Sequence, residues 1–252
     1  MPTLNWEGAC NIRDLGGLPT TDGQSIRERA LVRGESLTRL TPTGRAALVA
    51  YGIHTVIDLR STNEAAQWPS PFADFTSRPR YLNLPLIDEN DETGQAAHEA
   101  AVSLSELYSA ILKHGAAQLA PIFRALAEAE PGPVLVHCFV GKDRTGLVTA
   151  LALEVAGVPR AQIAEDYALS VPNLQPLYTE LKFGTDEDPI KRERQQRFLA
   201  APPEAMLAAL NYLDEAYGGV RGYLRAAGLT EAELQRVRDR LCKPLGSLRS
   251  RP

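Results

Sequence analysis

The 252-residue sequence contains few of the residues that cross-link a chain or bind metals. Its three cysteines, Cys10, Cys138 and Cys242, lie far apart and form no Cys-x-x-Cys pair, so neither a disulfide framework nor a zinc ribbon is indicated. The four histidines are scattered without the spacing of metal ligands. We therefore expect a protein of a reducing compartment that uses no metal and no other cofactor.

An excess of basic residues is also missing, because 27 lysines and arginines face 31 aspartates and glutamates, for a net charge of −4. This balance argues against a nucleic-acid partner and against stable membrane association through a polybasic surface. Long apolar runs are absent as well, since the stretch 147–157 is interrupted by Thr149 and Glu154. The first residues lack the basic and apolar segments of a signal peptide. We expect a cytoplasmic protein, with export by another route left open.

The remaining composition is typical of a globular protein, with 44% hydrophobic and 23% charged residues. Neither an internal repeat nor a clear linker is present, so we expect one domain over residues 1–252 rather than two small ones. Short apolar runs alternate with helical patterns and turn signals, which indicates an α/β fold. We expect strands near 30–33, 53–59, 81–84 and 134–136, and helices near 42–51, 104–114, 116–129, 147–156, 160–170, 204–217 and 231–241.

One stretch near the C-terminal third departs from this pattern. Residues 183–197 read FGTDEDPIKRERQQR, an acidic block followed by a basic block with almost no apolar residues. Such a charge run predicts either an exposed connector or a mobile helical flap.

The residues best suited to chemistry lie in the segment 134–146, which reads VLVHCFVGKDRTG. Cys138 and Arg144 bracket five residues between a buried strand and the start of a helix. A loop of this length can turn successive backbone N–H groups inward as an anion-binding nest, and the helix adds its positive end. Arg144 offers a planar fork for two phosphate oxygens, and the positive surroundings favour a thiolate at Cys138. The combination predicts covalent phosphoryl transfer through a cysteinyl-phosphate.

The other side chains of this loop fit the same interpretation. Gly141 lets the backbone approach the phosphate closely, and Lys142 adds a second positive charge at the rim. Asp143 is either paired outward with a cation or catalytic. Thr145 can donate a hydrogen bond to the sulfur, and His137 is expected to be a structural support rather than a general base. The expected phosphate-binding residues are Cys138, Phe139, Val140, Gly141, Lys142, Asp143 and Arg144.

The segment resembles the Cys-x5-Arg phosphate loop of protein tyrosine phosphatases, in the form HCxxGKDRTG. Three further elements resemble a bacterial group of these enzymes, the mycobacterial protein tyrosine phosphatase B type: NIRDLGG at 11–17, DLRSTNE at 58–64 and YGGVRGYL at 217–224. The resemblance covers nearly the whole chain. It implies the cysteine-phosphatase fold, a central, mostly parallel sheet flanked by helices, with extra C-terminal helices and a lid near 183–203.

The same resemblance implies activity on phosphotyrosine and, in some members, on phosphoserine, phosphothreonine or phosphoinositides. The expected partners are therefore a phosphorylated protein or a phosphoinositide. The preference among these substrates and the oligomeric state are not readable from the sequence.

The general acid is less sharply defined than the nucleophile. In the broader family it is an aspartate on a loop after a strand that precedes the nucleophile's strand. Asp88 has that position and is our first choice, and Asp91 is close enough to substitute. Asp143 is the rival, because it already lies in the loop. Asp58 is a weaker candidate, since Arg60 beside it suggests a structural ion pair that supports the site.

Two further sequence features have competing interpretations. Arg13 and Asp14 form either a plain ion pair in a turn or a support for the phosphate loop. The tripeptide Trp68-Pro69-Ser70 superficially resembles the Trp-Pro-Asp loop of eukaryotic tyrosine phosphatases, but its carboxylate is missing. We therefore do not assign it a catalytic role.

Two other classes of protein compete with a phosphatase. A phospho-binding module that has lost catalysis could use the same loop, although Cys138 and Arg144 are both present. A rhodanese-like sulfurtransferase or a thiol-based arsenate reductase also uses a reactive cysteine in an anion-binding loop. A reductase needs a resolving cysteine, and Cys10 and Cys242, which we interpret as small core residues, lie far from Cys138 in sequence.

Overall fold

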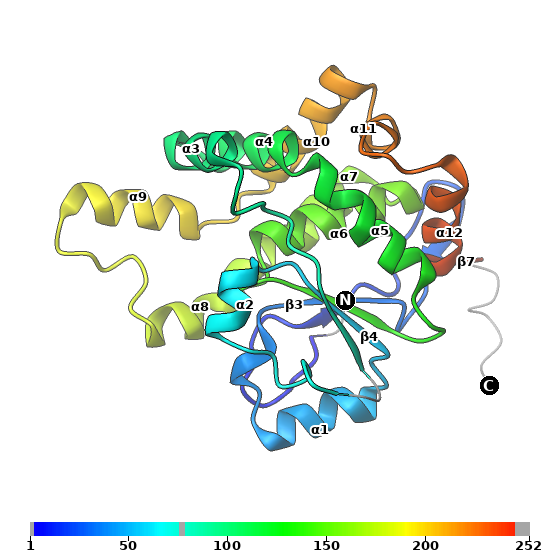
Figure 1. The fold of residues 1–252 in the computed structure, drawn as a ribbon, viewed down its shortest axis with the longest axis horizontal. Helices are drawn as coiled ribbons and strands as arrows, with labels where there is room; N and C mark the ends of the chain where they lie inside the picture. Colours follow the sequence, from blue (N-terminus) through cyan, green and yellow to red (C-terminus); the bar gives the residue numbers. More distant parts are fainter. Residues whose placement is uncertain (1–2, 76–78, 245–252) are drawn as a thin grey trace.

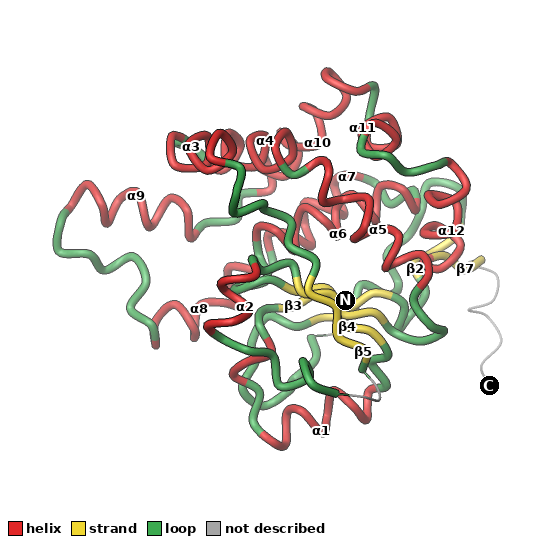
Figure 2. Tube along the Cα trace, viewed as in Figure 1, coloured by secondary structure: helices red, strands yellow, loops and turns green. Residues whose placement is uncertain are grey.

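The computed structural model describes residues 3–75 and 79–244. A five-stranded sheet runs through the middle of the molecule in the order β1-β3-β6-β4-β5 (Figures 1 and 2). All neighbouring pairs are parallel except β1 and β3. This arrangement confirms the α/β class and the mostly parallel sheet. The strands are β1 (Arg13–Asp14), β3 (Leu31–Gly34), β6 (Val134–His137), β4 (Thr55–Asp58) and β5 (Arg80–Asn83).

Alternate residues of the central strands face opposite sides of the sheet, as the period of two requires. Val134 and Val136 of β6 belong to the larger apolar cluster, whereas Leu135 between them belongs to the smaller one. Both faces of β6 are therefore covered, which explains its continuous apolar sequence. Gly34 and Asp58 lie opposite His137 in the register, so three strands end side by side where the candidate loop begins.

Helices cover the two faces of the sheet unequally. One face carries α1, and the other carries a layer that includes α5, α6, α7, α10 and α12 (Figure 1). The helices are α1 (Pro42–Tyr51), α2 (Thr62–Gln67), α3 (Glu92–Ala100), α4 (Leu104–His114), α5 (Ala116–Glu128), α6 (Asp143–Ala156), α7 (Arg160–Ala168), α8 (Ser170–Glu180), α9 (Pro189–Leu199), α10 (Pro203–Tyr217), α11 (Val220–Ala226) and α12 (Glu231–Leu241). A 3-10 turn, Leu37–Arg39, and a small antiparallel pair, β2 (Gln24–Ile26) with β7 (Cys242–Pro244), complete the described part of the chain. None of the described helices is both long and apolar enough to cross a membrane.

Every expected strand and helix is present, and the differences lie in short or polar elements. The sequence did not predict α2, α3, α8 or α11, whose apolar patterns are too short or too weak for a periodicity argument. The charge run contains α9, so it is helical in part, and its side chains are mostly exposed.

Candidate active site

The candidate phosphate loop connects the end of the central strand to the start of α6. Cys138 follows His137 directly and is only 2% exposed. Asp143 is the first residue of α6, so the N-terminal end of this buried helix points at the loop. The strand, loop and helix are thus arranged as the sequence predicted.

The backbone carbonyls of the loop are turned outward by donors from neighbouring elements. A trans peptide places the next N–H opposite each carbonyl, so outward carbonyls leave the following N–H groups facing into the loop. In this geometry the loop could offer those N–H groups to an anion without rearranging. The three anchoring bonds run from Ser36 N to Phe139 O at 2.8 Å, from Asn11 Nδ2 to Val140 O at 3.0 Å and from Arg33 Nη2 to Gly141 O at 2.9 Å.

A buried ion network holds two of these anchors. Asp166 of α7 accepts from Arg13 Nε at 2.7 Å and from Arg33 Nη1 at 2.5 Å, with all three side chains about 1% exposed. Arg13 also donates to Asn11 Oδ1 at 2.7 Å, and therefore reaches the loop through Asn11. Burial would raise the pKa of Asp166, but the two guanidinium charges outweigh it and lower that pKa. The supporting role expected of Arg13 is consistent with these contacts.

Gly141 has a structural function in addition to the expected one. Its φ is +73°, and a Cβ there would lie 2.3 Å from the backbone carbonyl carbon and oxygen of Gly34. Glycine is therefore needed so that the loop can pack on the end of β3.

Arg144 is held by Glu64, a residue that the sequence alone did not assign to the site. Two parallel hydrogen bonds, of 2.5 and 2.8 Å, join the guanidinium to the carboxylate. Glu64 also accepts from Ser61 N at 2.9 Å and so completes the capping box of α2. Burial opposes the charge of Arg144, but Glu64 outweighs it and raises the pKa of the guanidinium. Three of the five N–H donors of Arg144 remain for a phosphate.

Asp143 accepts a hydrogen bond from Tyr108, which in turn is hydrogen-bonded to a second buried tyrosine, Tyr167. Its Oδ1 accepts from the Tyr108 hydroxyl at 2.6 Å, and that hydroxyl lies 2.6 Å from the hydroxyl of Tyr167. Lys142 Nζ lies 3.5 Å from the same carboxylate oxygen. Burial, followed by the charge of Asp143, raises the pKa of Tyr108, so this tyrosine stays a donor. Both roles expected for Asp143, pairing with a cation and catalysis, remain compatible with this position.

The two other acid candidates, Asp91 and Asp88, differ in the hydrogen-bond partners of their carboxylates. Asp91 caps α3 by accepting from Gly94 N at 2.9 Å and lies 3.0 Å from His114 Nδ1, so its carboxylate has a structural function. Asp88 accepts only from Asn90 of its own loop, at 2.9 Å, among the hydrogen bonds of the described residues. It lines a cavity of about 240 Å³ together with Thr62, the first residue of α2. Asp88 is therefore the less constrained carboxylate.

Asp58 and Arg60 form the expected ion pair. Their side chains are fully buried, with Nη2 and Oδ2 2.6 Å apart. His137 lies beside this pair, 3.7 Å from Asp58 Oδ2, and its Nδ1 is 3.0 Å from Cys138 O. Burial lowers the pKa of His137, so the ring is neutral at pH 7 and fits a structural support. Thr145 is also fully buried, but its hydroxyl has no hydrogen-bond partner among the described atoms, so the expected bond to the sulfur is not formed here.

A family model described as "Tyrosine phosphatase family" matches residues 4–243. The chain belongs to this family. It is 35% identical over 232 residues to a tyrosine-protein phosphatase of Nostoc commune, which covers 88% of this chain and 78% of that protein. It is 34% identical over 269 residues to the triple specificity protein phosphatase PtpB of Mycobacterium tuberculosis, which covers 92% of this chain and 96% of that protein. The family expected from the sequence is confirmed, and neither a sulfurtransferase nor an arsenate reductase is indicated.

In this tyrosine phosphatase, Lys142 does not lie where the sequence suggested. The expectation of a charge at the rim is wrong, because the side chain is only 1% exposed. Its Nζ donates to the carbonyls of Phe198 and Ala200, at 2.5 and 2.7 Å, where α9 ends. A cation at a helix C-terminus interacts favourably with the helix dipole. Lys142 therefore joins the candidate phosphate loop to the C-terminal end of α9.

Asp14 also differs from its expected role. It accepts from Gly16 N at 2.9 Å, Arg29 N at 2.8 Å and Tyr51 Oη at 2.7 Å. It pairs neither with Arg13 nor with the loop among the described contacts, and instead stabilises the turn after β1.

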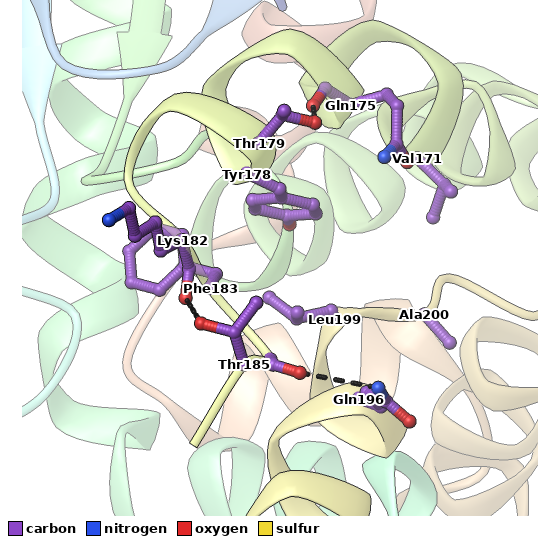
Figure 3. A pocket seen from close by; sticks show the side chains of 11 residues that line it. Val171, Gln175, Tyr178, Thr179, Lys182, Phe183, Thr185, Gln196, Leu199 and Ala200 are labelled. Carbon is purple, nitrogen blue, oxygen red and sulfur yellow. Dashed lines mark hydrogen bonds between the residues drawn. The ribbon is translucent and has the colours of Figure 1, made fainter. Parts of the chain in front are cut away.

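A cavity of about 500 Å³ lies between α8 and α9 (Figure 3). Gln175 and Tyr178 line it from α8, and Gln196 and Leu199 from α9. Tyr178 is also part of a small apolar cluster against which Val140 of the phosphate loop packs. The cavity thus borders the site. Among the described residues, no group of three or more acidic, histidine or cysteine side chains is arranged to hold a metal.

Proposed function

We propose that this protein hydrolyses phosphotyrosine through a cysteinyl-phosphate on Cys138. The observation that carries the proposal is the preformed loop, in which outward carbonyls and the Glu64-held Arg144 surround one buried cysteine. The Cys138 sulfur attacks phosphorus, and the bond from phosphorus to the tyrosyl oxygen breaks. A carboxylic acid gives that oxygen a proton, and water then splits the cysteinyl-phosphate into inorganic phosphate and the free thiolate.

The first test is turnover of a phosphotyrosine peptide near pH 6 without added metal. We expect hydrolysis by the wild type and none by Cys138→Ser. Turnover that survives in Cys138→Ser would rule out the covalent mechanism. Tight phosphopeptide binding by a wild type that does not hydrolyse the peptide would instead favour the phospho-binding module.

We propose Asp88 as the proton donor, because its carboxylate is not tied to a cation or a helix cap. Asp88→Asn is expected to lower kcat by ~10²–10⁴ for phosphotyrosine. The loss should shrink for an aryl phosphate with a good leaving group, which needs little protonation. Asp143→Asn serves as the comparison, and the assignment is wrong if only this variant depends on the leaving group.

Phosphorylated proteins are the expected substrate class, and the finer preference is also a proposal. Phosphoserine, phosphothreonine and phosphoinositides are candidate secondary substrates, and the PtpB relative is named a triple specificity protein phosphatase. The buried position of Lys142 removes one cation that a polyanionic headgroup would need. We therefore expect phosphotyrosine to have the highest kcat/KM in a panel of phosphotyrosine, phosphothreonine and phosphoinositide substrates.

We also propose that residues 183–203 act as a lid on a single domain of residues 1–252. The proposal is supported by the bonds from Lys142 to the end of α9 and by the cavity beside the loop. A cytoplasmic location, without stable membrane association, fits an enzyme whose thiolate must stay reduced.

A further inference from the structure

A pair of aromatic side chains, the exposed Trp68 and the half-buried Phe139, lies next to the candidate nucleophile Cys138. Trp68 contacts Phe139, the residue after Cys138, with ring centroids 5.4 Å apart and planes inclined by 56°. Trp68 is 42% exposed although it is one of the largest apolar side chains in the chain. An exposed indole beside the candidate site is free to contact the aromatic group of a ligand.

The position of Trp68 is fixed by the same short helix that holds Arg144. Trp68 follows the last residue of α2, and its carbonyl accepts from Arg60 Nη1 at 2.8 Å. Glu64, one turn earlier, makes the two hydrogen bonds to Arg144. Arg144 and Phe139 belong to one loop, so α2 contacts the phosphate loop at two separate points. The indole of Trp68 is therefore held at the edge of the place where a phosphate would bind.

We propose that Trp68 and Phe139 form an aromatic platform that binds the phenyl ring of phosphotyrosine and favours aryl over alkyl phosphates. The inference rests on the proposed function and deepens it. An ester held by the loop must extend outward from the phosphate, and an aromatic group there can stack on or meet the edge of the two rings. A phosphoserine or phosphothreonine side chain has no aromatic ring, so contact with Trp68 and Phe139 adds little to its binding free energy. The Trp68-Pro69-Ser70 tripeptide thus serves substrate selection without a carboxylate.

The test compares two phosphopeptides of one sequence, containing phosphotyrosine or phosphothreonine. Trp68→Ala is expected to lower kcat/KM for the phosphotyrosine peptide by ~10-fold and for the phosphothreonine peptide by less than ~2-fold. Trp68→Phe should restore most of the preference, whereas Trp68→Leu, which keeps apolar bulk, should not. Phe75→Ala is the matched control, because Phe75 is 46% exposed and packs against Phe72 instead.

Any other outcome would contradict the proposal that Trp68 and Phe139 bind the phenyl ring. Equal losses on both peptides would mean that Trp68 supports α2 and Arg144 rather than the ring. An unchanged ratio in both Trp68→Ala and Trp68→Leu would mean that the ring binds elsewhere. Thermal unfolding of each variant separates loss of folding from loss of preference, and Trp68→Leu remains informative if Trp68→Ala does not fold. A wild type without phosphotyrosine turnover would instead refute the proposed function itself.

Discussion

Arg144 depends on a carboxylate from another element for its orientation. A guanidinium at the end of a flexible side chain has many rotamers, and ordering it on substrate binding costs free energy. The two bonds to Glu64 order it in advance, and the capping box with Ser61 orders Glu64 in turn. In the proposed mechanism Glu64 is accordingly a positioning residue, since it would act on the phosphate through Arg144.

Glu64→Gln should lower kcat/KM for phosphotyrosine peptides by ~10–100-fold, because hydrogen bonds to charged groups are stronger than neutral ones. If Glu64 acts only by positioning Arg144, iodoacetamide should still alkylate Cys138 in Glu64→Gln, whereas inorganic phosphate should bind this variant more weakly than the wild type. Glu180→Gln is the control, since Glu180 pairs with Arg39 on the surface, where both side chains are more than 40% exposed. Equal phosphate affinity in Glu64→Gln and the wild type would contradict this role.

At the scale of elements, α9 makes few apolar contacts with the rest of the molecule. Its sequence is mostly polar, most of its side chains are exposed, and only Phe198 and Leu199 at its end pack against apolar clusters of the described residues. An isolated helix of eleven residues is marginal in water, so contacts at its ends matter. The bonds from the buried Lys142 to Phe198 O and Ala200 O are such contacts, and they couple α9 to the phosphate loop.

Lys142→Met should loosen α9 while the central sheet stays folded. We expect cleavage by endoproteinase Glu-C at Glu187 and Glu193 to become ~10-fold faster, since the substitution removes two hydrogen bonds from a charged donor. Lys182→Met is the control, because Lys182 lines the cavity between α8 and α9 but is exposed. Neither substitution alters a Glu-C site. Equal cleavage rates in the two variants would show that Lys142 does not hold the segment.

At the scale of the whole molecule, buried ion pairs connect the sheet to the site. Asp58 at the end of β4 pairs with Arg60, and Asp166 joins β1 and β3 to α7. Burial would raise the pKa of Asp58, but its interactions with His137, Arg60 and Tyr81 together outweigh burial and lower that pKa. A carboxyl whose pKa is lowered by folding stabilises the fold above its unfolded pKa, near ~3.9, and loses that contribution as the pH falls through its folded pKa.

Asp58→Asn should therefore lower the free energy of unfolding by ~3–5 kcal/mol at pH 7, since it leaves Arg60 buried without its counter-charge. The difference in unfolding free energy between Asp58→Asn and the wild type should become smaller below pH ~4, where the stabilising contribution of the Asp58–Arg60 pair begins to fall. Urea unfolding at pH 7 and at pH 3.5 measures both values. Asp74→Asn at an exposed site is the control. A difference that does not change with pH would contradict the ion-pair explanation.

Local sequence determined much of this protein without help from tertiary contacts. The strand, loop and helix around Cys138 follow from an apolar run, two glycines and a helix start that are adjacent in the chain. The Asp58–Arg60 pair also lies within three residues. In each case the interacting groups are close in sequence, so propensity and spacing suffice.

Only the tertiary structure decided which distant residues act on the loop. Asn11 and Arg33 bind the loop, and Asp166 of α7 holds Arg33, because strand ends and α7 converge there. No local pattern in the sequence predicts these contacts. Glu64 was visible only as the last residue of the DLRSTNE element. Lys142 was misjudged because a lysine in a polar loop normally faces water, whereas here the end of α9 supplies carbonyls that make burial favourable. The sequence alone thus identifies Cys138 as the candidate nucleophile, whereas the fold decides which groups surround it.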